Sequence, residues 1–417
     1  MKWLVILVLS FSLLTETSGV FAKQGKSYAM SLKVFKKMEQ ANLLVEEKKF
    51  LEALEILNEQ LEKRSSKYEK AQIHSLIGSI HYRNSDQQSA IEAFERVLQS
   101  AGGMPIVLHT QTLKTLAQLS LVMENYQQAR DYCQQIISIA GETLKPMDYA
   151  LLAQANYKLE DWEAALDAAL KGRSLALSME KKPDENLLLL LNAVHFELQQ
   201  IDKMREVLEE MIRYYPKTSY MLYLASVYGQ LDRLDKQTVL MESLYEDGRI
   251  KDASQLKNLA SLYMSEKTPY KGALVLDKAL RNEQLKATAR NFEMLAQAWR
   301  LAAEREKAII ALGQAAELSD DGDNYLQKAY LHFDMAQWRK TSEALMLGFD
   351  KGLTKRLEGE AWLLLGMARF KMKRYEQAIQ ACERAKDFKK AAKHAEQWIA
   401  YISTEKRKIE SMQQVLN

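Results

Sequence analysis

Cysteine, proline and net charge are all scarce in this chain of 417 residues. It has 2 cysteines, 5 prolines and 16 glycines, and its 58 lysine and arginine residues nearly balance 55 aspartate and glutamate residues, which leaves a net charge of +3. Two cysteines provide neither a disulfide framework nor a pair at metal-binding spacing. A charge this small gives no electrostatic basis for binding nucleic acid. So few prolines and glycines leave long helices unbroken.

Sequence motifs with a chemical mechanism are also missing. The chain has no phosphate-binding loop, no glycine-rich dinucleotide turn, no His-Glu-x-x-His and no nucleophile elbow. It also lacks the runs of alternating valine, isoleucine and threonine from which a sheet would form. We therefore predict an all-α protein that is not an enzyme and that holds no cofactor and no metal ion.

The N-terminal residues predict a targeting segment. Met1-Lys2 gives a short positive start, Trp3 to Leu14 is a largely apolar run, and Val20-Phe21-Ala22 fits a small-residue cleavage site. The run is shorter than the roughly 20 apolar residues of a membrane span, and nothing later approaches that length. We expect residues 1–22 to be a cleaved signal peptide, with an uncleaved anchor as the alternative. The mature chain is then expected in a bacterial periplasm, with no stable membrane span.

Residues that are usually alanine or glycine recur in one sequence frame along the chain, at a period of roughly 34 residues. The recurring positions are Ala53, Ala90, Ala129, Ala165, Met204, Gln237, Gly272, Ala308, Thr341 and Ala378. A second series precedes them: Ala41, Gly78, Ala117, Ala153, Asn192, Ala225, Ala260, Ala296, Ala329 and Gly366. Two antiparallel helices approach closely only where the side chains between them are small. The pattern predicts about ten helix-turn-helix repeats that bury their apolar faces by stacking on one another.

The best-preserved repeat reads Trp362-Leu363-Leu364-Leu365-Gly366, then Tyr375-Glu376-Gln377-Ala378-Ile379, then Ala385. It resembles the tetratricopeptide repeat (TPR) family, except that Cys382 stands where the family usually has a large aromatic. The resemblance implies a right-handed superhelix of about ten units over residues 23–385. We expect the basic segment 386–417 to be a capping helix and tail, because a solenoid end needs a polar cover. A basic amphipathic helix for a membrane surface is the alternative.

The inner face of the superhelix is the candidate binding site. In TPR proteins the first-helix side chains line this face, and peptides usually dock there. The resemblance places six aromatic residues at one recurring inward position: Tyr82, Tyr157, Phe196, Tyr330, Phe333 and Phe370. Aromatic anchors beside neutral polar groups suit a peptide better than a phosphate, so a protein partner is expected. Packing between repeats is the alternative role for each ring.

Three other features have both a structural and a functional interpretation. His81, His195 and His332 fall at equivalent first-helix positions, and Cys133 and Cys382 at equivalent second-helix positions. Whole repeats separate equivalent positions, so we predict hydrogen bonding or packing for the histidines and burial for the cysteines. In the acidic segment 319–324 the acids are adjacent, which is the wrong spacing for a calcium loop. We predict that its side chains cap helices.

Three passages, residues 317–323, 359–366 and 395–402, carry a narrower resemblance. With the repeat order, they are similar to Gram-negative periplasmic TPR proteins that accompany a TonB–ExbB–ExbD energy-transduction system. This resemblance implies a protein-binding scaffold that serves uptake across the outer membrane, for example iron–siderophore import. The implied partner is the periplasmic part of a TonB-type transducer. A periplasmic assembly factor or adaptor for outer-membrane or envelope machinery is the alternative.

Overall fold

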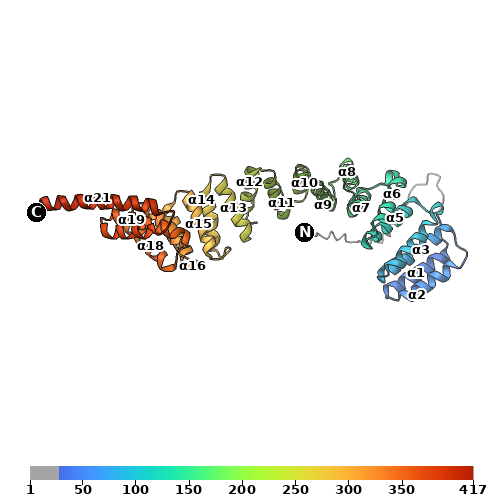
Figure 1. Cartoon of the computed structure of the whole chain (residues 1–417). Coiled ribbons are helices and arrows are strands. Elements are labelled where there is room, and N and C mark those ends of the chain that lie inside the picture. Colours follow the sequence, from blue (N-terminus) through green and yellow to red (C-terminus); the bar gives the residue numbers. More distant parts are fainter. Residues whose placement is uncertain (1–27, 417) are drawn as a thin grey trace. The chain divides into compact units, whose positions relative to one another are not determined.

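The structure of the chain is a computed structural model that describes residues 28–416. Within that range it contains 21 α-helices, two 3-10 helices and no strand (Figure 1). The all-α prediction is therefore confirmed for the described residues. The predicted signal peptide, residues 1–22, lies outside them. No helix in the described range is long and apolar enough to cross a membrane.

The chain divides into two compact units, Met1–Val227 and Tyr228–Asn417. The helices of the first unit are α1 (Leu32–Glu46), α2 (Phe50–Leu61), α3 (Lys67–Arg83), α4 (Gln87–Leu98), α5 (Ile106–Val122), α6 (Tyr126–Ile139), α7 (Pro146–Lys158), α8 (Trp162–Ser178), α9 (Glu185–Glu197) and α10 (Ile201–Tyr214), with the 3-10 helices η1 (Ala101–Gly103) and η2 (Gly141–Thr143). The division falls within α11 (Thr218–Gln230). The second unit contains α12 (Leu234–Glu246), α13 (Ala253–Ser265), α14 (Pro269–Arg281), α15 (Ala289–Leu301), α16 (Arg305–Leu318), α17 (Asp323–Asp334), α18 (Trp338–Lys351), α19 (Lys355–Lys371), α20 (Tyr375–Lys386) and α21 (Ala392–Leu416).

Within each unit, helices adjacent in sequence pack as hairpins, such as α3 with α4 and α19 with α20. All residues of both series are buried. A Cβ atom added to Gly366 would lie 2.4 Å from the Sγ atom of Cys382, and one added to Gly78 would lie 2.9 Å from the Phe94 ring. The small residues therefore make room for side chains of the second helix, as the sequence frame predicts.

The turn inside each hairpin has the same backbone conformation. One residue with φ between 54° and 62° follows each first-helix small residue at a constant spacing, and these residues are Lys48, Ser85, Glu124, Glu160, Gln199, Asp232, Lys267, Ala303, Ala336 and Lys373. None is glycine, although this left-handed region favours glycine. The amide of the next residue closes the turn on the carbonyl five residues earlier, as Asp86 does on His81 at 2.9 Å. The constant turn keeps all repeats in one frame.

Polar side chains fix the helix starts of the first hairpins. The Ser66 side chain accepts the Glu69 amide, and Glu69 in turn accepts the Ser66 amide, which forms a capping box at the start of α3. Glu69 also accepts the hydroxyl and the amide of Ser31, which is the N-cap of α1. These hydrogen bonds, the Ser31 hydroxyl first, lower the pKa of Glu69 to about 2. The carboxylate thus joins the starts of α1 and α3.

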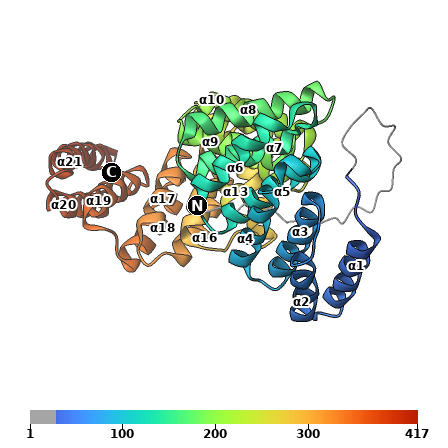
Figure 2. The same cartoon turned by 90° about the vertical axis from the view of Figure 1, so that its right-hand side faces the viewer.

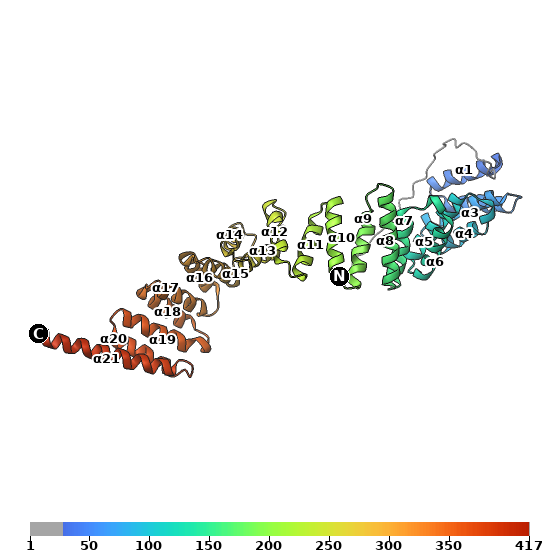
Figure 3. The same ribbon diagram turned by 90° about the horizontal axis from the view of Figure 1, so that it is seen from above.

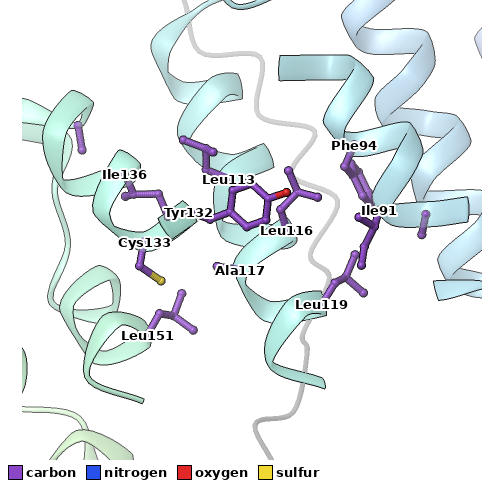
Figure 4. Packing of buried hydrophobic residues seen from close by; sticks show 12 residues of the cluster. Ile91, Phe94, Leu113, Leu116, Ala117, Leu119, Tyr132, Cys133, Ile136 and Leu151 are labelled. Atoms are coloured by element: carbon purple, nitrogen blue, oxygen red, sulfur yellow. The ribbon is translucent and has the colours of Figure 1, made fainter. Parts of the chain in front are cut away.

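Apolar side chains of neighbouring hairpins form the core. Phe94 and Ile91 of α4 face Leu116 and Leu119 of α5, and Cys133 of α6 continues the same cluster (Figure 4). All are buried. No hairpin in this cluster encloses its apolar residues by itself, so stability depends on stacking.

The last helix packs as the first helix of another repeat would. α21 lies beside α19 and α20 (Figure 3), where Ile402 is fully buried against Ala378 and Cys382. Ala400 occupies the position of Gly366 in the next repeat but is exposed, because no second helix covers it within the described residues. The basic segment predicted from residue 386 begins with the last residue of α20, and α21 itself starts at Ala392.

Candidate protein-binding surface

Two of the six aromatic residues, Tyr330 and Phe333, lie one turn apart on α17. Both are half-buried and pack against the core between α17, α18 and α19. The Phe333 ring meets Trp338 edge-on, with ring centroids 4.9 Å apart. The Tyr330 hydroxyl donates to the Glu360 carboxylate of α19 at 3.4 Å. Burial and then Glu360 raise the pKa of Tyr330 to about 12, so the hydroxyl keeps its proton at neutral pH.

Phe370 of α19 belongs to an aromatic cluster that includes α21. Its ring centroid lies 5.3 Å from Tyr401, 5.9 Å from Trp398 and 5.9 Å from Tyr375. Phe370 is half-buried, while Tyr401 is 50% exposed. Tyr401 was not among the residues predicted for this surface, although it stands one repeat after the position of Met367. We call the four residues Tyr330, Phe333, Phe370 and Tyr401 the unit 2 row.

The other three predicted residues lie in the first unit and have separate surroundings. Tyr82 packs against the core cluster around Phe94. The Tyr157 ring meets Trp162 edge-on at 5.0 Å, and its hydroxyl donates to Glu197 at 3.3 Å. Phe196 is 55% exposed, which makes it the one clearly exposed ring of the six.

The prediction of one shared position is wrong for Tyr330. The other five residues follow a first-helix small residue by four positions, whereas Tyr330 follows Ala329 by one. Tyr330 stands instead at the position that Met367 takes directly after Gly366. Positions three apart on a helix are neighbours on one face, so Tyr330 still lies beside Phe333.

An ion pair joins two repeats of the first unit. The Lys114 ammonium of α5 lies 2.6 Å from Oδ1 of Asp148, whose side chain is 1% exposed at the start of α7. The other oxygen of Asp148 accepts the Lys145 amide at 2.8 Å. The Lys114 ammonium therefore neutralises a buried carboxylate of its own chain. It is not available to bind a negatively charged group of a partner.

The predicted structural roles of the histidines and cysteines are confirmed. Nδ1 of each histidine lies within hydrogen-bond distance of the side chain five residues later, in the pairs His81–Asp86 at 3.2 Å, His195–Gln200 at 2.8 Å and His332–Gln337 at 2.8 Å. Each pair spans the turn of its hairpin. Both cysteines are buried and free. Burial raises the pKa of Cys133 to about 12 and that of Cys382 to about 11, so both stay protonated and unreactive at neutral pH.

The acidic segment caps helix starts, as predicted. The Asp321 side chain accepts the amide of Asp323 at 3.1 Å. The Asp323 carboxylate accepts the amide of Thr354 at 3.0 Å and its hydroxyl at 3.1 Å, which links α17 to the start of α19. Among the described residues, no three His, Cys, Asp or Glu side chains are grouped so that they could hold a metal ion.

A second apolar series, which was not predicted from the sequence, lies on the second helices of the second unit. Val239 of α12, Leu274 of α14 and Ile310 of α16 are 66%, 46% and 63% exposed. Each stands two positions after a member of the recurring series that runs from Ala53 to Ala378. Acids occupy the same position in other repeats, namely Glu55, Glu92, Asp131, Asp167, Glu206 and Glu343. The three aliphatic residues provide a comparison surface for the unit 2 row.

Part of the hairpin frame matches a known repeat family. A profile of the family described as tetratricopeptide repeat matches residues 38–105 and 349–395, one segment in each unit. Comparison with curated proteins gives no match. A solved tetratricopeptide repeat protein from Parabacteroides merdae is similar at 15% identity, over 63% of this chain and 99% of that chain, with a TM-score of 0.37. The C-terminal part of a TPR repeat-containing protein from Cytophaga hutchinsonii is similar at 13% identity, over 68% of this chain and 95% of that chain, with a TM-score of 0.40.

Proposed function

We propose that this chain, a tetratricopeptide-repeat solenoid, is a non-enzymatic scaffold that binds a protein partner on the unit 2 row. The proposal rests on this row, because its four aromatic side chains lie on α17, α19 and α21. α17 and α19 are the first helices of two successive repeats, and α21 packs as the first helix of the next repeat would. Aromatic residues are overrepresented among those that dominate binding energy. TPR proteins mediate protein–protein interactions, which supports the general role.

The chemistry of the row favours a peptide segment with apolar side chains over a highly charged partner. Arg369, next to Phe370, is half-buried and donates to the Gln377 carbonyl at 3.3 Å. Burial, then the charge of Arg374, lowers the pKa of Arg369. Because this guanidinium is hydrogen-bonded within its own unit, the aromatic rings of the row are expected to supply most of the contact with a partner. Binding is expected to depend weakly on salt.

We propose further that the scaffold works in the periplasm as an accessory of TonB-dependent energy transduction for outer-membrane uptake. The support is the similarity of residues 317–323, 359–366 and 395–402 to periplasmic TPR proteins that accompany TonB–ExbB–ExbD systems. The partner in this proposal is the periplasmic part of a TonB-type transducer. A purified transducer segment is therefore the probe for the binding experiment.

Replacing a ring of the row is expected to weaken binding of that segment. Tyr330→Ala and Phe333→Ala should each raise the Kd by about 30-fold in a calorimetric titration, which corresponds to a loss of about 2 kcal/mol. Leu274→Ala, a similar truncation on the comparison surface, should leave the Kd within about twofold of the parent value. Thermal unfolding of each variant shows that it remains folded.

The two levels of the proposal fail separately. Equal binding by the parent and both ring variants would exclude the unit 2 row as the site. Loss of binding in Leu274→Ala alone would move the site to the comparison surface. Failure of the folded parent to bind the segment would exclude the transducer as its partner.

A further inference from the structure

The first helix of the first unit has an apolar side that the described residues leave uncovered. α1 packs on α2 and α3 (Figure 2). Leu43, two residues after Ala41, is 58% exposed. The equivalent residues of the later repeats are all buried: Ile80, Leu119, Ala155, Val194, Val227, Leu262, Ala298, Leu331 and Ala368. Ile80, for example, packs with Leu57 of the preceding hairpin. Leu43 therefore lies where a preceding helix would cover it.

The uncovered side of α1 has a regular order of residue types. Leu32 and Leu43, 68% and 58% exposed, stand at its two ends, with exposed Lys36 and Glu39 between them. At about 100° per residue, these four lie within about 60° of one another around the helix. Neither Lys36 nor Glu39 forms an ion pair with another described residue. The order along the helix is apolar, positive, negative, apolar.

This order of side chains is complementary to the same order on an antiparallel copy of the helix. In an antiparallel pair that places Leu32 opposite Leu43 of a second copy, Lys36 lies opposite the second copy's Glu39. A two-fold axis repeats both contacts, because residue i meets j and j meets i. The pair spans about 16 Å, or three helical turns. Moving the register by three residues would instead bring the two Glu39 side chains together.

We propose that the partner of this side of α1 is a second copy of the same chain, held through an antiparallel α1–α1 contact. Burial of Leu32 and Leu43 supplies the apolar contact, and the two Lys36–Glu39 pairs fix the register. A three-turn helix pair is smaller than the roughly 1,200–2,000 Å² interfaces of stable complexes. The dimer is therefore reversible, with an expected Kd of roughly 10–100 μM.

Sedimentation equilibrium of the full chain from about 5 to about 500 μM tests the contact, since the dimer fraction depends on concentration. Lys36→Glu places a carboxylate opposite each Glu39, and Glu39→Lys places an ammonium opposite each Lys36. Each variant alone should weaken association at least about tenfold. A mixture of the two variants should regain parental association, because every opposed pair is then of opposite charge. Lys33→Glu, the same charge change on an exposed side of α1 away from Leu32 and Leu43, should behave as the parent.

Each contrary outcome overturns the proposal. A parent that stays monomeric to about 500 μM, as it would if its own preceding residues covered α1, excludes the dimer. A dimer that Lys36→Glu leaves unchanged excludes this face and points to another surface, such as Val239, Leu274 and Ile310. Failure of the mixed variants to associate excludes the antiparallel register. Circular dichroism of each variant shows that α1 remains helical.

Discussion

Replacing Lys114 by methionine is expected to lower the free energy of unfolding of the first unit by about 3 kcal/mol. The substitution leaves the Asp148 carboxylate, 1% exposed, without its cation at 2.6 Å. This loss lies at the lower end of the range for breaking a buried ion pair, because the Lys114 side chain is itself 25% exposed. Urea denaturation followed by circular dichroism measures the change.

Matched variants separate this effect from the general loss of a lysine. Lys171→Met removes an ammonium 2.7 Å from Asp167, but both side chains are more than half exposed, so no measurable change in the free energy of unfolding is expected. The double variant Lys114→Met with Asp148→Asn should recover most of the lost stability, because no buried charge remains. An unchanged free energy of unfolding in Lys114→Met would show that water reaches Asp148.

Replacing Ile402 by alanine is expected to cost about 2–5 kcal/mol, the range for truncating a large buried aliphatic side chain. Ile402 is fully buried against Ala378 and Cys382, and the loss falls on the contact that holds α21 to the last hairpin. Hydrogen exchange should speed up over α21 and remain unchanged over α12 and α13. Met412→Ala, on the same helix but at a residue 66% exposed, should change stability by less than about 0.5 kcal/mol. Equal exchange in parent and Ile402→Ala would mean that α21 is held elsewhere.

The repeat frame could be predicted from the sequence because its cause is steric and local. A small residue is needed wherever two helix backbones approach, and the burial of Ala41, Ala53 and their successors confirms the frame. The turns could not be predicted, because lysine, glutamate and alanine occupy a backbone conformation that normally signals glycine. Tertiary packing imposes this turn conformation against the local preference.

The binding surface was less predictable than the repeat frame, because residues that pack between repeats and residues that bind a partner recur with the same period. The resemblance to TPR proteins put Phe370 on the inner face, but the cover supplied by Trp398 and Tyr401 depends on how α21 packs. Tyr401 itself stands in a lysine-rich segment that suggests a polar tail. The exposed aliphatic series at Val239 is visible only when the acids at the same position in other repeats are aligned with it.

Hydrogen–deuterium exchange with and without the periplasmic part of a TonB-type transducer tests the proposed scaffold function most directly. With the segment present, exchange should slow over α17 and α19, which carry Tyr330, Phe333 and Phe370, and stay unchanged over α12, α14 and α16. Slower exchange confined to α12, α14 and α16, or none anywhere at saturating segment, would contradict binding on the unit 2 row.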